Sequence, residues 1–159
     1  MKTFLEEIQD FFFRAMLQGW VADGEKVSIP GMPGYQAFPF AEGDFYLLDC
    51  YVVNPESSKS AGTTTIWYQE KPVWVMLYRG LYQEDAIPVV KAALLETYHA
   101  GRFIGGRGPK QFKMGNLEYT NDAPNDDQFT SFQGSESVRD TTYARPSLGW
   151  HRYWGMSLI

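Results

Sequence analysis

Two carboxylates stand inside stretches that otherwise have the apolar pattern of β-strands. Asp49 shares one side of its predicted strand with Leu47, and Glu136 lies between Phe132 and Val138. A buried charge needs an opposite charge or hydrogen-bond donors. Three arginines are candidates for that role: Arg79, Arg107 and Arg139. Two interpretations follow, a polar site in an aromatic cavity or a set of ion pairs at a sheet edge, and the ion pairs are favoured because they occur without any catalysis.

The stretch GRFIGGRG, residues 101–108, is close to the phosphate-binding loop G-x-x-x-x-G-K-[ST]. That loop follows a strand and opens a helix, whereas here a helix is expected to come before it. Arg107 occupies the lysine position, Gly108 replaces the hydroxyl residue, and Pro109 removes an amide donor. The sequence therefore predicts a flexible helix-to-strand connection and no nucleotide site.

Residues suited to metal binding or nucleophilic catalysis are few. The two histidines, His99 and His151, and the one cysteine, Cys50, lack the spacing of metal ligands. Cys50 lies in an apolar predicted strand, where we expect a free thiol to be buried and inert. No G-x-S-x-G motif is present. We therefore assign no catalytic residue, no metal ligand and no cofactor, and we favour a non-catalytic role over an enzyme.

Composition narrows the class of protein. The length of 159 residues predicts a single domain spanning residues 1–159. The net charge of −5 argues against a nucleic-acid partner, which usually requires a basic patch. There is no run of about 18 apolar residues, so we expect no membrane association. Acidic residues in the first ten positions break the apolar stretch of a signal peptide, and we expect a cytoplasmic protein, with homo-oligomers left open.

Two helices are expected. Residues 3–19 have the spacing of an amphipathic helix that opens with a capping box of Thr3 and Glu6. A second helix is predicted at residues 86–99, with Asp85 as its N-cap. Two glycines are expected to end these helices: Gly19 and Gly101.

The remaining pattern is that of strands and turns. Six segments are predicted as strands: residues 45–53, 63–69, 72–78, 111–120, 129–138 and 150–157. Residues 24–34 are rich in glycine and proline and predict a loop, and residues 121–127 predict a polar turn. The segment 72–78 is apolar on both sides, which predicts a strand covered on both faces. The order of elements indicates an α+β fold: a mainly antiparallel, curved sheet of about six strands, with an N-terminal helix and a second mid-chain helix packed on one face.

Several short motifs recur together in one order. They are EGDFY at residues 42–46, KPVWVMLYRG at 71–80, RGP at 107–109 and FQGSE at 132–136. In this order they resemble a bacterial domain-of-unknown-function family, found alone or attached to helix-turn-helix, repressor-type regulators. The resemblance covers residues 4–155 and implies that the glycine-rich stretch is the R-G-P turn of that family. It implies no activity and supplies no catalytic residues.

Three hypotheses for function follow, in order of preference. The first is a small-ligand-binding or sensing module, which the aromatic content and the carboxylates in strands favour. The second is a protein-interaction or assembly module that uses an exposed aromatic surface around Trp150, Tyr153 and Trp154. The third is a cofactor-independent enzyme that uses a carboxylate as general acid or base.

A ligand site, if formed, is expected where aromatic residues and opposite charges meet. The period of two in a strand places Trp74 and Tyr78 on one side, and the strand before them carries Asp49. Arg107 and Glu136 belong to the two motifs of the second half of the chain. The sequence therefore predicts a ligand-binding group of Asp49, Trp74, Tyr78, Arg107 and Glu136.

Overall fold

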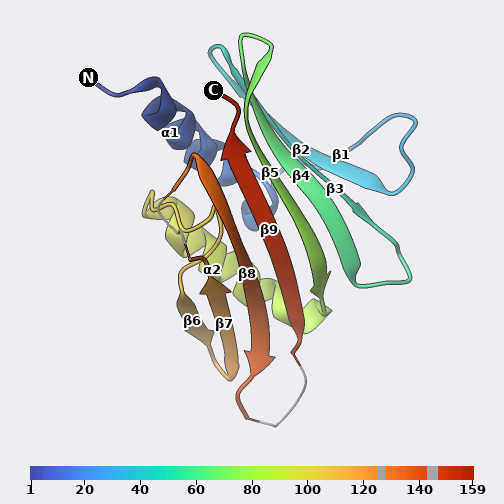
Figure 1. Ribbon diagram of the computed structural model, residues 1–159. Coiled ribbons are helices and arrows are strands. Elements are labelled where there is room, and N and C mark those ends of the chain that lie inside the picture. The colour runs from blue at the N-terminus through green and yellow to red at the C-terminus, as the bar shows by residue number, and fades with distance from the viewer. Residues whose placement is uncertain (125–127, 143–146) are drawn as a thin grey trace.

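One antiparallel sheet dominates the fold of this computed structural model, which describes residues 1–124, 128–142 and 147–159 (Figure 1). Its nine strands lie in the order β1-β2-β3-β4-β5-β9-β8-β7-β6. The strands are β1 (Val27–Ser28), β2 (Tyr35–Glu42), β3 (Phe45–Val53), β4 (Lys59–Tyr68), β5 (Lys71–Tyr82), β6 (Gln111–Met114), β7 (Leu117–Asp122), β8 (Ser131–Asp140) and β9 (Gly149–Ser157).

Two α-helices, α1 (Phe4–Met16) and α2 (Ile87–His99), lie against one face of the curved sheet, which we call the inner face (Figure 1). Short 3-10 helices precede β1 and α2, namely η1 (Trp20–Ala22) and η2 (Glu84–Ala86). The α+β class, the antiparallel sheet and the placement of both helices are as predicted.

Helix α1 begins with the predicted capping box. The Thr3 hydroxyl accepts from the Glu6 amide at 3.3 Å, and the Glu6 carboxylate accepts from the Thr3 amide at 2.6 Å. Phe11 and Phe12 on its inner side are completely buried. Gly19 was expected to end the helix in the left-handed conformation, and this is wrong, because the φ of Gly19 is −97° and the helix already ends at Leu17, a C-cap in the right-handed conformation.

Helix α2 buries one side, which includes Val90, Leu94 and Tyr98. Its start differs from the prediction, because Asp85 belongs to η2 and Ala86 is the N-cap without a side-chain hydrogen bond. Pro88 fits in the first turn, where the amide that proline lacks would have no helical acceptor. Gly101 follows the last turn with a φ of 61°, the left-handed stop that was predicted.

The sheet has nine strands instead of about six. Strands β1 and β2 were missed, since β1 has two residues in a segment assigned to a loop and Pro39 interrupts the pattern of β2. The predicted strand 111–120 is in fact the hairpin β6–β7, which turns at Gly115 with a φ of 59°. The predicted polar turn 121–127 begins inside β7, and its residues 125–127 lie outside the described residues.

The two faces of the sheet are not equally covered. On β5, Trp74, Met76 and Tyr78 point to the inner face and are buried, whereas Val75 and Leu77 on the outer face are half-buried. The outer face of β5 is thus less covered than its inner face, and the prediction that this strand is covered on both faces holds only in part. No described helix has the length and apolar character needed to cross a membrane.

Candidate functional site

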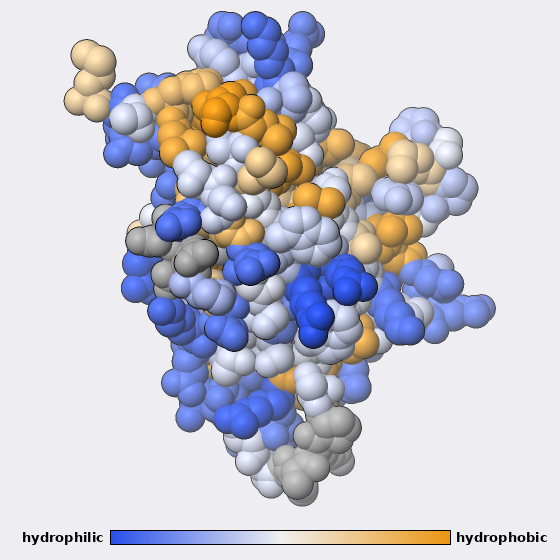
Figure 2. Space-filling model, in the orientation of Figure 1, coloured by the Kyte–Doolittle hydropathy of each residue, from blue (hydrophilic) through white to orange (hydrophobic). Residues whose placement is uncertain are grey.

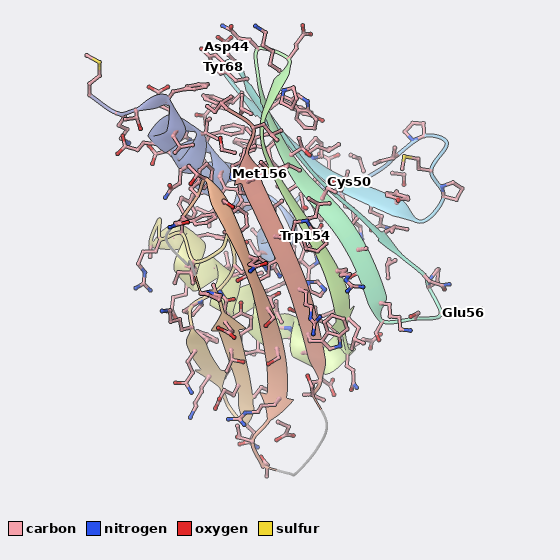
Figure 3. The ribbon with its side chains drawn as sticks, viewed as in Figure 1. Asp44, Cys50, Glu56, Tyr68, Trp154 and Met156 are labelled. Atoms are coloured by element: carbon pink, nitrogen blue, oxygen red, sulfur yellow. The ribbon has the colours of Figure 1, made fainter. Side chains whose placement is uncertain are left out.

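A cavity of about 520 Å³ lies between the inner face of the sheet and the helices. Its deep end contains buried polar side chains, including Asp49 and Arg107. Its mouth lies at the exposed β3–β4 loop, residues 55–58, and at Glu84 of η2. Figure 3 shows Glu56 at the far end of that loop. The volume falls within the usual range for small-molecule sites.

The helical side of the cavity supplies its apolar walls. Met16 at the end of α1, Trp20 and Val21 of η1, and Leu94 of α2 all line it. The ammonium group of Lys91 lies 4.9 Å from the centre of the Trp20 ring and also forms an ion pair with Asp23, and these contacts hold the indole at the wall.

Asp49 is the deepest carboxylate of the cavity wall. Its Oδ1 accepts from the Thr64 hydroxyl at 2.9 Å and from the Tyr78 hydroxyl at 2.8 Å. In the described part of the chain, no donor lies within hydrogen-bond distance of its Oδ2 and no cation forms an ion pair with it. Burial raises the pKa of Asp49 above its ordinary value, and the bonds from Tyr78 and Thr64 oppose that change.

Strand register explains how these groups meet. Asp49 on β3 lies opposite Thr64 on β4, and Tyr78 on β5 lies opposite Gly62. Strand β4 therefore separates Tyr78 from Asp49. A side chain at position 62 would place its Cβ 2.6 Å from the Tyr78 ring, so glycine is needed there for the ring to reach across β4 to the carboxylate.

Glu136 lies behind the cavity, within a second polar cluster. It accepts from Nε and Nη2 of Arg107, from the Tyr82 hydroxyl, and from the Tyr119 hydroxyl at 2.5 Å. Burial alone would raise the pKa of Glu136, but the Arg107 guanidinium holds it below its usual value. Arg107 is thus bound to Glu136 on one side while it lines the cavity on the other.

Residues 52–148 match the family model described as Domain of unknown function (DUF5680). The chain belongs to the DUF5680 family. No curated protein and no solved structure matches the chain. The matched segment is shorter than the resemblance over residues 4–155. It includes Arg107 and Glu136 but begins after Asp49.

The R-G-P turn of this DUF5680 chain is part of the core. The Tyr98 hydroxyl donates to the Gly106 carbonyl at 2.9 Å, and the Gly108 amide donates to the Tyr119 hydroxyl at 3.0 Å. Arg107 is almost completely buried. The segment joins α2 to β6 as predicted, but the expected loose connection is instead buried and hydrogen-bonded.

His151 on β9 contributes an imidazole to the cavity wall. Its Nδ1 is buried 3.7 Å from Glu136 Oε1 and has no hydrogen-bond partner among the described residues, while its Nε2 lies 3.5 Å from the Ser60 hydroxyl. Burial lowers the pKa of His151 to about 4, although the charge of Glu136 opposes this shift. Gly80 lies opposite His151, and a Cβ at Gly80 would come within 2.3 Å of the ring.

The sequence-predicted site residues occupy three different positions. Asp49, Tyr78 and Arg107 line the cavity together, and Glu136 supports Arg107 from behind. Trp74 is not in the cavity wall. Its indole stacks on Phe129 with ring centres 5.0 Å apart and donates to the Phe129 carbonyl. Trp74 and Tyr78 do share a face, but four residues of strand separate them by about 13 Å, which places Trp74 in the core.

Several lining residues were missed by the sequence analysis. They are the aromatic and imidazole side chains of Trp20, Tyr51, Tyr82, Tyr98 and His151. Aromatic residues in strands and helices are usually core, so their types alone give no signal. Gly62 and Gly80 did offer one, because an isolated glycine inside a strand often marks the close approach of another group.

The outer face has different features. Trp154 and Met156 of β9 are about half exposed, and Cys50 is on the same side of the sheet (Figure 3). The expectation that Cys50 is buried is therefore wrong. Tyr153, which was grouped with the exposed aromatics, points to the inner face and is buried, where it donates to Asn121.

Proposed function

We propose that this chain is a non-catalytic small-ligand-binding or sensing module, and that its cavity is the ligand site. The observation that carries the proposal is a cavity of about 520 Å³ with apolar walls and a buried carboxylate at its deep end. Such a site can enclose the apolar part of a small molecule while a few polar groups orient it. Asp49, Tyr78 and Arg107 are the polar contacts in this proposal, and Glu136 positions Arg107.

The family resemblance supports the sensing role by analogy. It implies bacterial proteins in which the domain occurs alone or attached to helix-turn-helix regulators. A ligand-binding module is a common companion of such regulators, although fold and family alone do not fix a function.

A fragment screen by protein-observed NMR tests the proposal. We expect hits that shift the signals of cavity residues, and we expect Ser60→Phe to abolish them, because Ser60 lines the cavity and a ring there would fill it. The matched control is Ala61→Phe, since neighbouring residues of a strand point to opposite faces and Ala61 is exposed. No hit in the cavity, or hits that persist in Ser60→Phe, would contradict the proposal.

The outer face favours a second candidate, an assembly module that pairs two copies of the chain. Trp150, Trp154 and Met156 are exposed on β9, and two apolar residues follow at the C-terminus, Leu158 and Ile159. Figure 2 shows apolar residues gathered at the end of this face near the C-terminus. Light scattering on the wild type and on Trp154→Gln tests this candidate, and a monomer at all concentrations would reject it.

A further inference from the structure

Asp49 lines the cavity and has one carboxylate oxygen to which no described residue donates a hydrogen bond. Thr64 and Tyr78 both donate to Oδ1, and in the described residues nothing donates to Oδ2. The side chain is almost fully buried yet lines the cavity. A carboxylate oxygen without a protein donor, at the wall of a largely apolar cavity, can accept a hydrogen bond from a ligand, and a bond to a charged acceptor is stronger than one between neutral groups.

The charges around the cavity favour a cation over an anion. Three carboxylates line it, Asp49 at the deep end and Glu56 and Glu84 at the mouth, against the one guanidinium of Arg107. The charge of Arg107 is already offset by Glu136 through two of its nitrogens. An anion placed on Arg107 would therefore face the negative charge of both Glu136 and Asp49.

Aromatic side chains supply the other feature of a cation site. The rings of Tyr51, Tyr78, Tyr82 and Tyr98 line the cavity, and Trp20 lines its helical wall. The faces of such rings attract cations, most strongly where water is excluded. The same rings, with Met16 and Leu94, can also bury an apolar body.

We propose that the cavity selects small molecules that carry a protonated amine on an apolar or aromatic body, with the ammonium group bound to Asp49 Oδ2. The body lies against Trp20, Met16 and Leu94, and Arg107 remains bound to Glu136. This inference rests on the proposed function and narrows it to one class of ligand.

Three probes of nearly equal shape test the charge preference. Phenethylamine, phenethyl alcohol and hydrocinnamate carry the same phenyl ring and differ in the polar end, which is cationic, neutral or anionic. We expect NMR titrations at neutral pH to show the amine binding about tenfold tighter than the alcohol, and the carboxylate weakest. Asp49→Asn should remove the preference for the amine, because the isosteric amide keeps the acceptor for Thr64 and Tyr78 but carries no charge.

Asp44→Asn is the matched control, because Asp44 is an exposed residue of the β2–β3 turn and the same charge is removed away from the cavity. A direct readout on the wild type is the pKa of Asp49 from carbon NMR of its carboxyl group, which the bound amine should lower. This readout needs no variant to fold.

The outcomes separate this inference from the proposed function. If the alcohol or the carboxylate binds in the cavity as tightly as the amine, or if the amine binds Asp49→Asn unchanged, the amine preference is wrong and the ligand site stands. If no molecule of the fragment screen and none of the three probes reaches the cavity, the proposed function fails, and this inference fails with it.

Discussion

Asp49 and Glu136 lie on the same face of one sheet, and both are almost completely buried. Glu136 uses both oxygens, with donors from Arg107, Tyr82 and Tyr119. Asp49 uses one oxygen, and no ion pair reaches it among the described residues. A carboxylate with all its acceptors occupied holds elements together, whereas one with an acceptor open to a cavity is available to a ligand.

The comparison extends to the elements that each carboxylate connects. Glu136 joins β8 to the R-G-P turn, to β5 and to β7, which lie far apart in the sequence. Within the described residues, Asp49 joins β3 only to its neighbour β4 and to β5, all within one meander. Removing the charge of Glu136 should therefore lower the stability of the fold, whereas removing the charge of Asp49 should change ligand binding.

The largest effect is expected for Glu136→Gln. This change leaves the buried Arg107 guanidinium without a counter-charge, which typically costs about 3–5 kcal/mol of unfolding free energy. Urea unfolding at neutral pH measures the loss. The control is Glu42→Gln, because Glu42 forms an ion pair with Arg14 in which both side chains are about half exposed, and such pairs contribute at most about 1 kcal/mol. Equal losses in the two variants would contradict a structural role for the Glu136 cluster.

His151 should give the cluster a pH dependence. Its folded pKa of about 4 lies below its ordinary value of 6.5, so between these values the unfolded chain takes up a proton that the folded chain does not. The contribution of His151 to the free energy of unfolding is therefore fully present above about pH 6.5. It is lost as the pH falls toward 4, by at most about 1.4 kcal/mol per pH unit.

The difference between the wild type and His151→Gln measures the contribution of His151 together with its effect on the pKa of Glu136, whereas the contribution of Asp49 is common to both proteins. His99→Gln, at an exposed helix end, is the control. The free energy of unfolding is measured for the wild type and His151→Gln from pH 7 to pH 4. A difference between the two proteins that stays constant over this range would show that the imidazole does not titrate as its burial requires.

The sequence indicated the two carboxylates better than the site around them. A charge in an apolar strand is conspicuous, and the period of two correctly placed Asp49 on the same face as Leu47. The partner of Glu136 could not be chosen among three arginines, because the choice depends on which loop folds back on β8. Only the structure shows that Arg107 reaches it and that Arg139 pairs with Glu118 instead.

The fold was predicted to a similar extent. Capping chemistry and helical spacing are local, and they located both helices within a few residues. Strand β2 was missed because it contains Pro39, and proline is uncommon inside a sheet. The structure places β2 next to the sheet edge, where only the two-residue β1 lies beyond it. The insertion of β9 beside β5 depends on long-range pairing that no local pattern encodes, and it is this pairing that brings His151 to the cavity.

A smaller effect is expected for Tyr78→Phe, read out at Asp49. The Tyr78 hydroxyl donates to Oδ1 and opposes the upward shift that burial gives the pKa of Asp49. Loss of this bond should raise that pKa further, because a hydrogen bond donated to the carboxylate favours its charged form. Carbon NMR titration of the Asp49 carboxyl measures it, and Tyr82→Phe is the matched control because that hydroxyl donates to Glu136. A shift of equal size in both variants would mean that the two carboxylates belong to one coupled cluster.

The smallest effect on stability is expected for Asp49→Asn. The folded pKa of Asp49 is raised, so the folded state holds its proton more tightly than the unfolded state and the ionised form costs stability. The cost appears as pH rises through the raised folded value, and it is absent below the unfolded value. Asparagine removes that charge while its carbonyl can still accept from Thr64 and Tyr78.

Asp49→Asn should thus be as stable as the wild type at neutral pH, or more stable by about 1 kcal/mol or less, and the difference should vanish in acid. Urea unfolding of both proteins, at neutral pH and below pH 4, measures the difference in unfolding free energy under each condition. A loss comparable with that of Glu136→Gln would mean that Asp49 is held by a structural partner, and its open oxygen would then no longer be available to a ligand. An equal or greater stability, together with loss of amine binding, is the pattern of a carboxylate that is kept for binding at some cost to the fold.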